Sequence, residues 1–223
     1  LGIAVRRPEV MLGWIRAYAA ATSTSASYNA ILDAATPGQG DKPARETGVA
    51  YRDALTRLWL LDPVPAWQPG GSALSRLGQA PKHHLVDPAV AARLLGLGVG
   101  HLLDGEGAAL GGAPGSMLGH LWESLVTLCV RVPAQAAEAS VGHLRTRNGD
   151  HEVDLVVERD DGKVVAVEVK LARTVEDRDV RHLHWLRDRL GDRMLDAVVV
   201  TTGPEAYRRP DGVGVVPLAL LGP

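Results

Sequence analysis

The sequence has only one cysteine, Cys129, which excludes an internal disulfide and suits a cytoplasmic protein. No apolar run reaches the roughly 18 residues that a transmembrane helix needs, and no signal-peptide pattern is present. We therefore expect no membrane association, and we expect Cys129 to be a buried helix residue. The motif G-x-x-x-x-G-K-[ST] is absent, so any ATPase domain lies outside these residues. Because the chain begins at Leu1 without a methionine, we interpret it as part of a longer protein.

Basic residues are not in excess, since 24 lysines and arginines stand against 26 aspartates and glutamates. The chain as a whole therefore lacks the basic surface typical of nucleic-acid-binding proteins, although arginines cluster locally. No Ser-His-Asp or Cys-His arrangement for nucleophilic catalysis is evident. The histidine pairs His83-His84 and His182-x-His184 lack the spacing of common zinc sites, and we assign them structural or solvated roles.

What the sequence does contain is a β-hairpin with charged residues in unusual positions. Residues 153–159 and 163–170 are rich in valine, and the Asp-Asp-Gly at 160–162 between them is typical of a turn. If the loop is those three residues, paired residue numbers sum to 322, because 159 + 163 = 322. Asp154 then lies directly opposite Glu168, and Lys170 lies two residues further along the same face.

This placement of charge is costly, because apolar residues on both faces predict a hairpin that is covered on both sides. Two adjacent carboxylates near such a core repel each other unless positive charge lies between them. Lys170 supplies one charge, and a hard divalent cation such as Mg²⁺ would supply two. The alternative is a structural ion-pair cluster, for example Glu152 with Lys170, but this leaves Asp154 opposite Glu168 without a packing reason.

The pattern D-x13-E-V-K, from Asp154 to Lys170, resembles the PD-(D/E)xK motif of nucleases with the restriction-endonuclease-like fold. The resemblance implies that Asp154 and Glu168 bind Mg²⁺ or Mn²⁺ and that Lys170 orients or activates the attacking water. It also implies a metal contact from the Val169 carbonyl and a further carboxylate on the preceding helix, a role that Glu123 fits.

The sequence motifs resemble one subset of these proteins more closely. The segment G-x-x-x-E ending at Glu123, the Arg145-Thr146 pair, E-V-D at 152–154 and E-V-K at 168–170 look like the C-terminal nuclease-like module of a family of AAA-type ATPases. That module is mainly of unknown function. The resemblance covers most of the chain and implies an ATPase domain in the same full-length protein, with DNA as a partner. One departure is Val153, which stands where the motif's name has proline.

Residues 1–95 are predicted to form a mostly helical, winged-helix-like domain, as the resembling family has before its nuclease-like module. Apolar spacing indicates helices over 8–20, 28–35 and 47–59, followed by extended segments at 60–67 and 82–86. In a DNA-binding winged helix, residues 47–59 would be the recognition helix, with Arg45, Arg52 and Arg57 as contacts. Glu46 and Asp53 offset these arginines, which favours a packing or interaction role instead.

Residues 96–115 are glycine-rich and are predicted to be a connection after a helix at 87–95, and residues 116–223 are predicted to be the restriction-endonuclease-like domain. We expect a helix at 116–132, strands at 139–147, 153–159 and 163–170, a helix at 176–190, a strand at 196–202 and a short edge strand at 213–217. This order predicts an α/β fold with a mixed sheet flanked by helices. Arg145 and Arg147 share a strand face and either contact a nucleic-acid phosphate or brace the acidic cluster.

These observations together predict a nuclease-like module, a metal-dependent endonuclease that hydrolyses DNA phosphodiester bonds with Mg²⁺ or Mn²⁺. The alternative is a non-catalytic nucleic-acid- or protein-binding module coupled to an ATPase. A third class, a winged-helix transcription factor, would show a steep salt dependence of duplex binding, and the net charge of −2 disfavours it.

Overall fold

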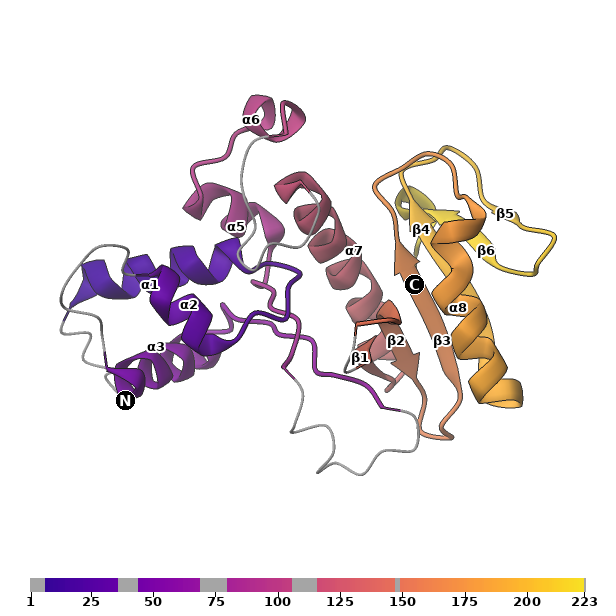
Figure 1. Ribbon diagram of the computed structural model, residues 1–223, viewed down its shortest axis with the longest axis horizontal. Coiled ribbons are helices and arrows are strands. Elements are labelled where there is room, and N and C mark those ends of the chain that lie inside the picture. Colours follow the sequence, from indigo (N-terminus) through magenta and orange to yellow (C-terminus); the bar gives the residue numbers. More distant parts are fainter. Residues whose placement is uncertain (1–6, 36–43, 69–79, 106–115, 147–148, 223) are drawn as a thin grey trace. The chain divides into compact units, whose positions relative to one another are not determined.

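The computed structural model describes residues 7–35, 44–68, 80–105, 116–146 and 149–222 (Figure 1). It divides into two compact units, which are described separately: Leu1–Pro63 with Ala80–Ser124, and Val64–Gln79 with Leu125–Pro223. This division differs from the one expected from the glycine-rich stretch at 96–115, because residues 96–105 group with the N-terminal unit. Part of that stretch, 106–115, lies outside the described residues.

The N-terminal unit is mostly helical, as predicted. Its helices are α1 (Pro8–Ala20), α2 (Tyr28–Ala34), α3 (Arg45–Arg57), α5 (Pro88–Leu94), α6 (Val99–Leu103) and the first part of α7 (Met117–Ala136). The Ser27 hydroxyl caps α2 by accepting the Ala30 N–H at 3.1 Å, and Asp87 caps α5 from the expected N-cap position. Helix α6 lies within the stretch 96–115 that is predicted to be a connection. Among the helices described, none has the length and apolar composition needed to cross a membrane.

The two extended segments expected after α3 do not form a paired ribbon. Leu61 and Leu85 make an isolated antiparallel bridge, with the Asp62 N–H donating to the His84 carbonyl at 2.9 Å. Helix α3 also ends two residues early, because Trp59 has a φ of 59° and the Leu60 N–H closes the turn onto the Leu55 carbonyl.

The C-terminal unit is built on a six-stranded mixed sheet, which confirms the predicted fold class. Its strands are β1 (Ser140–Arg145), β2 (Glu152–Glu158), β3 (Val164–Val169), β4 (Met194–Thr201), β5 (Tyr207–Arg208) and β6 (Gly214–Pro217), in the spatial order β1-β2-β3-β4-β6-β5. The pairs β3–β4 and β4–β6 are parallel, and the others are antiparallel. The prediction of β6 as an edge strand is wrong, because the two-residue strand β5 pairs with it.

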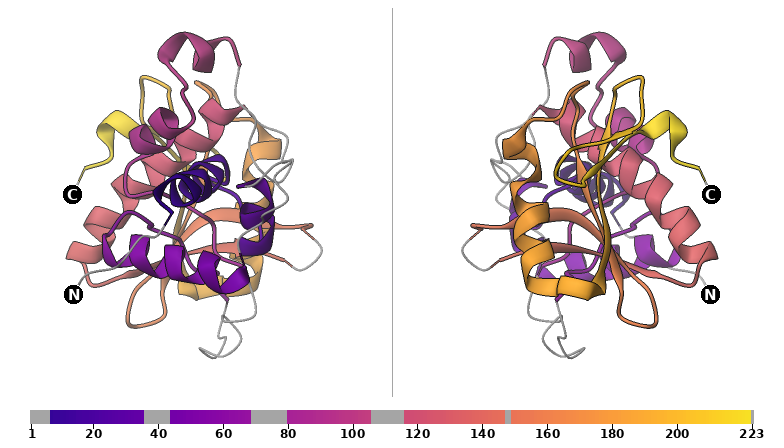
Figure 2. Two further views of the ribbon diagram at one scale, coloured as in Figure 1. Left: turned by 90° about the vertical axis from the view of Figure 1, so that its left-hand side faces the viewer. Right: turned by 90° about the vertical axis from the view of Figure 1, so that its right-hand side faces the viewer.

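Helices cover both faces of this sheet, as the apolar residues on both sides of the hairpin predict. Val156, Val164 and Ala166 pack with Leu183 and Leu186 of α8 (Asp177–Leu190) in one buried cluster. The C-terminal half of α7 lies over the other face, and Figure 2 shows α7 and α8 on opposite sides of the strands. Cys129 on α7 is half-buried, so the expectation that it is buried is wrong.

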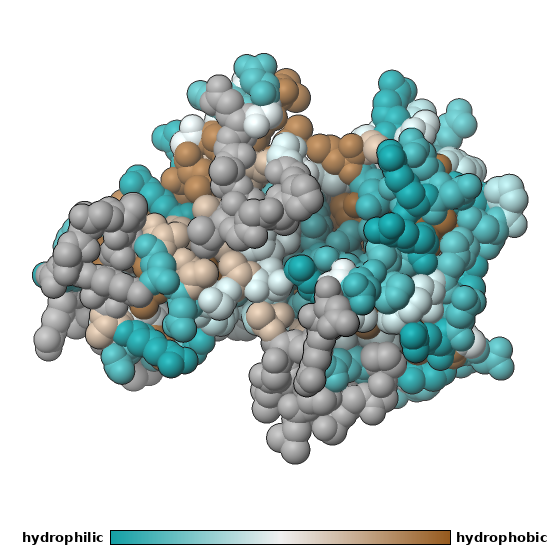
Figure 3. Space-filling model, viewed as in Figure 1, coloured by the Kyte–Doolittle hydropathy of each residue, from teal (hydrophilic) through white to brown (hydrophobic). Residues whose placement is uncertain are grey.

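The amphipathic character of α8 fixes which of its faces meets the sheet. Val180, Leu183, Leu186 and Leu190 are buried at helical spacing, and the remaining surface over α8 is predominantly hydrophilic (Figure 3). Asp179 in its first turn accepts the Glu176 N–H at 2.9 Å. This cap sets the start of the helix beside the end of β3.

Residues 65–67 contribute an unexpected strand-like contact to the edge of the sheet. The Trp67 N–H donates to the His143 carbonyl at 2.6 Å, and the His143 N–H donates to the Pro65 carbonyl at 2.9 Å. Gly142 permits this approach, because a Cβ there would lie 2.8 Å from the Trp67 Cβ and 3.1 Å from the Pro65 oxygen. The Trp67 indole N–H then donates to Glu158 at 2.8 Å.

Replacing Gly142 with alanine should therefore destabilise the C-terminal unit by about 1–3 kcal/mol, because the added methyl group meets a Cβ and backbone that cannot move freely. Gly214→Ala is the matched control, since a Cβ at this strand glycine makes contacts of only 3.6 Å or more. Urea unfolding followed by fluorescence measures both. Equal stability of the two variants would contradict the close approach at Gly142.

Candidate functional site

The predicted register of the central hairpin is confirmed. The ladder pairs Leu155 with Val167 and Glu158 with Val164, and each pair sums to 322. The Arg159 N–H donates to the Lys163 carbonyl at 2.9 Å, and Gly162 takes a φ of 75° in the turn. The ladder ends at Leu155 and Val167, one step short of Asp154 and Glu168, and just beyond it the Val169 N–H donates to the Asp154 carboxylate.

The charged residues of the hairpin come together on the face that α8 covers. The Lys170 ammonium lies 2.9 Å from Oε1 of Glu168 and 4.0 Å from Oδ1 of Asp179 on α8. Oδ2 of Asp154 accepts the Val169 N–H at 2.9 Å. Glu168 is buried, with 6% of its surface exposed, while Asp154 and Lys170 are half-buried.

Charge around Lys170 keeps it protonated. Burial alone lowers the pKa of this lysine, but the carboxylates of Glu168, Asp154 and Asp179 act in the opposite direction and together raise the pKa above its ordinary value. Lys170 is therefore a fixed cation and hydrogen-bond donor at neutral pH. In this protonation state it cannot serve as a general base.

A histidine pair adjoins the acidic cluster. His151 precedes β2 and stacks on Trp185 of α8, with ring centroids 4.0 Å apart. Its Nδ1 lies 3.3 Å from Nδ1 of His182, also on α8. Burial, followed by the charges of Arg181, His151 and Lys170, lowers the pKa of His182, so this imidazole is neutral at neutral pH.

Sequence reasoning missed Asp179, His182 and Trp185 as neighbours of the site. They come from α8, and only the packing of that helix on the sheet brings them near the hairpin. The start of α8 was predicted correctly from Glu176 onward, but no pattern in the sequence of the helix distinguishes the half-buried Asp179 from the other acidic residues of α8.

The other predicted site residues have different surroundings. Glu123 belongs to the N-terminal unit, where its carboxylate lies 2.8 Å from the buried ammonium of Lys82, and its role as a metal ligand stays a prediction. The Nε atom of Arg145 lies 4.0 Å from a carboxylate oxygen of Glu152, its partner across the β1–β2 ladder. The sequence alone suggests Lys170 as the ion-pair partner of Glu152. Arg147 lies outside the described residues. Arg52 and Arg57 lie on α3 of the N-terminal unit.

The donor set of the cluster suits a hard cation. Carboxylate and carbonyl oxygens are the ligands that Mg²⁺ and Mn²⁺ prefer, and Asp154, Glu168 and the Val169 carbonyl supply such atoms within two neighbouring strands. Over the described ranges, no group of three or more His, Cys, Asp or Glu side chains is arranged to hold a metal ion. A cation here would therefore need the backbone carbonyl and water to complete its coordination.

Comparison with known families divides the chain in two. Residues 118–221 match the family model of a domain of unknown function, DUF4143. The DUF4143 match contains the whole hairpin and α8, and domains of this family are commonly associated with AAA-type ATPases. Residues 3–99 match a second domain of unknown function, DUF8612. Searches of curated proteins and of solved structures give no match.

The electrostatics of Lys170 can be measured directly. In Glu168→Gln the lysine stays buried but loses its strongest attraction, so its pKa should fall relative to the wild type. A pH titration of the lysine ¹³Cε resonances measures the pKa of Lys170. Asp161→Asn, in the hairpin turn, is the control and should leave that pKa unchanged.

The same shift predicts a pH dependence of stability. A raised folded-state pKa stabilises the fold below the unfolded-state value of 10.5 and loses that contribution as the pH rises through the folded-state pKa. The wild type should therefore lose more stability than Lys170→Met above about pH 10.5. A lysine that titrates below 10.5 in the wild type would contradict both expectations.

Proposed function

We propose that the C-terminal unit is a nuclease-like module of the PD-(D/E)xK type that hydrolyses DNA phosphodiester bonds with Mg²⁺ or Mn²⁺. The observation that supports this proposal is the convergence of Asp154, Glu168 and Lys170 on one face of the hairpin. An ion-pair cluster needs only one carboxylate for one lysine. Here a single lysine faces three carboxylates, counting Asp179, which is a surplus of negative charge that suits a cation.

In this proposal Asp154, Glu168 and the Val169 carbonyl hold the metal ion, and the predicted ligand Glu123 is tested separately. When bound, such an ion polarises the phosphate and lowers the pKa of a coordinated water. Lys170 donates hydrogen bonds as a cation, so it positions the water or stabilises negative charge that develops on the phosphate. Asp179 and Glu168 hold the lysine in place for this task.

DNA would approach from the side where the hairpin meets α8 and β1. Arg145 is half-exposed on β1, and Arg181 is exposed on α8, so both can meet a phosphate. The ATPase domain expected in the full-length protein would supply the coupling to nucleotide hydrolysis. Both partners are part of the proposal.

A second candidate is a non-catalytic nucleic-acid- or protein-binding module coupled to an ATPase. A specific observation favours it, because each carboxylate of the hairpin already has a partner. Lys170 neutralises Glu168, and the Val169 N–H satisfies one oxygen of Asp154. The cluster is therefore a stable structural element even without a metal.

A plasmid-nicking assay with Mg²⁺ and with Mn²⁺ tests catalysis. Wild type should nick supercoiled DNA, and Glu168→Ala and Lys170→Ala should each lower the rate by about 10²–10³-fold, because each removes charge from the reacting centre. Asp161→Ala, which removes an acid from the exposed turn of the same hairpin, is the control and should retain full activity. Circular dichroism verifies that each variant is folded.

If wild type and all variants are equally inert with both metals, the catalytic proposal fails for this chain and the binding module becomes the better description. Duplex binding measured at two salt concentrations then decides between nucleic acid and protein as its partner.

Metal binding can be tested without activity. Calorimetric titration with Mn²⁺ should show a site that Asp154→Asn weakens at least about tenfold, because a carboxylate ligand becomes a neutral amide. Glu123→Gln, measured alongside, determines whether this residue is a ligand as predicted. Identical Mn²⁺ affinities of the wild type and Asp154→Asn would contradict the proposed metal site.

A further inference from the structure

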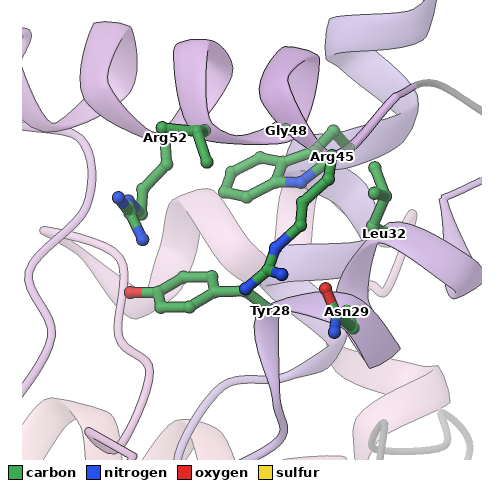
Figure 4. A pocket seen from close by; sticks show the side chains of 8 residues that line it. Tyr28, Asn29, Leu32, Arg45, Gly48 and Arg52 are labelled. Carbon is green, nitrogen blue, oxygen red and sulfur yellow. The ribbon is translucent and has the colours of Figure 1, made fainter.

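A small pocket opens between α2 and α3 of the N-terminal unit, away from any residue used in the proposed function. Its volume is about 100 Å³. The lining residues that matter here are Trp14, Tyr28, Asn29, Arg45, Gly48 and Arg52. Figure 4 shows Arg45 and Arg52 extending from α3 toward Tyr28 and Asn29 on α2. The lining of the pocket therefore combines two aromatic side chains, Trp14 and Tyr28, with two cationic side chains, Arg45 and Arg52.

The positive charge of this pocket is only weakly compensated. Arg45 forms no ion pair with any of the described residues. The guanidinium of Arg52 lies 4.9 Å from the centroid of the Tyr28 ring, a cation–π contact that orients it without neutralising it. Within the part of the chain that the structure describes, its ion-pair partner is Asp53, at 3.5 Å in a largely exposed pair, and such pairs contribute little. An anion would complete the arrangement.

Gly48 keeps the pocket open. A glycine inside a helix lowers stability relative to alanine, so its presence in α3 needs a reason. Close packing is not that reason, because a Cβ at Gly48 would lie 3.4 Å from Leu32 and 3.8 Å from the Trp14 indole nitrogen, which are ordinary contacts. The methyl group would instead occupy part of the pocket. A ligand that uses this space accounts for the glycine.

We propose that this pocket binds a phosphate group. Two planar guanidinium groups can each donate paired hydrogen bonds to a tetrahedral oxyanion. The Tyr28 hydroxyl adds a donor, since burial raises the pKa of Tyr28 and keeps it protonated. The volume is well below the roughly 300 Å³ at which pockets for drug-sized ligands begin, so it suits a single oxyanion and not a nucleobase.

The phosphate group has two sources that this chemistry does not separate. One is inorganic phosphate or a phosphate monoester, and the other is a phosphodiester of a nucleic-acid backbone. In the second case Arg52 makes the nucleic-acid contact that the sequence predicts, but Arg57 does not take part, because it lies outside the pocket.

Calorimetric titration of the 223-residue chain with inorganic phosphate, at constant ionic strength, tests the site. Arg45→Gln and Arg52→Gln should each weaken binding about tenfold or more, because each removes a charge-assisted hydrogen-bond pair. Arg57→Gln is the matched control on the same helix and should bind like the wild type. Competition by a DNA oligonucleotide without terminal phosphates identifies the backbone as the source, and absence of competition identifies the monoester.

The Gly48→Ala variant tests phosphate binding in a way that separates loss of the ligand from loss of the fold. The variant should melt about 2 °C higher than the wild type, because alanine favours the helix, and yet bind phosphate at least about threefold more weakly. The proposal is overturned if the wild type binds no phosphate, if Arg57→Gln weakens binding as much as Arg45→Gln, or if Gly48→Ala binds as tightly as the wild type. None of these results depends on nuclease activity.

Discussion

The register between β2 and β3 is the constraint on which the candidate site depends. Side chains alternate along a strand, so a shift of one residue would move Asp154 to the opposite face from Glu168 and Lys170. The three-residue turn closed by Gly162 fixes that register, and the valines on both faces make any slip costly. The position of Asp154 near Glu168 and Lys170 is thus a consequence of the turn at the opposite end of the hairpin.

The balance of charge at this hairpin is what separates the two candidate functions. Lys170 has more acidic neighbours than it can neutralise, yet the carboxylates also receive a backbone N–H and sit beside helix α8. A cation that entered would share Glu168 with the lysine. In the proposed metal site, Lys170 and the ion would therefore compete for the Glu168 carboxylate, with Asp179 as the second acidic neighbour of the lysine.

Sequence reasoning succeeded where structure is local. The turn at 160–162, the cap at Asp87 and the apolar spacing of α8 each depend on neighbouring residues, and each was predicted correctly. It failed where contacts join distant segments. The ion pair of Lys82 with Glu123 and the contact of Trp67 with His143 link residues 41 and 76 positions apart, and no periodicity encodes such pairs. Asp179 was missed for the same reason.

The contact of residues 65–67 with β1 has a consequence for association between chains. An open strand edge presents unpaired backbone groups that can act as a template for another molecule. At His143, in the interior of β1, both backbone groups are already bonded to Pro65 and Trp67, and the opposite edge of the sheet is the two-residue strand β5. Neither border offers a long ladder, so the sheet resists intermolecular strand exchange.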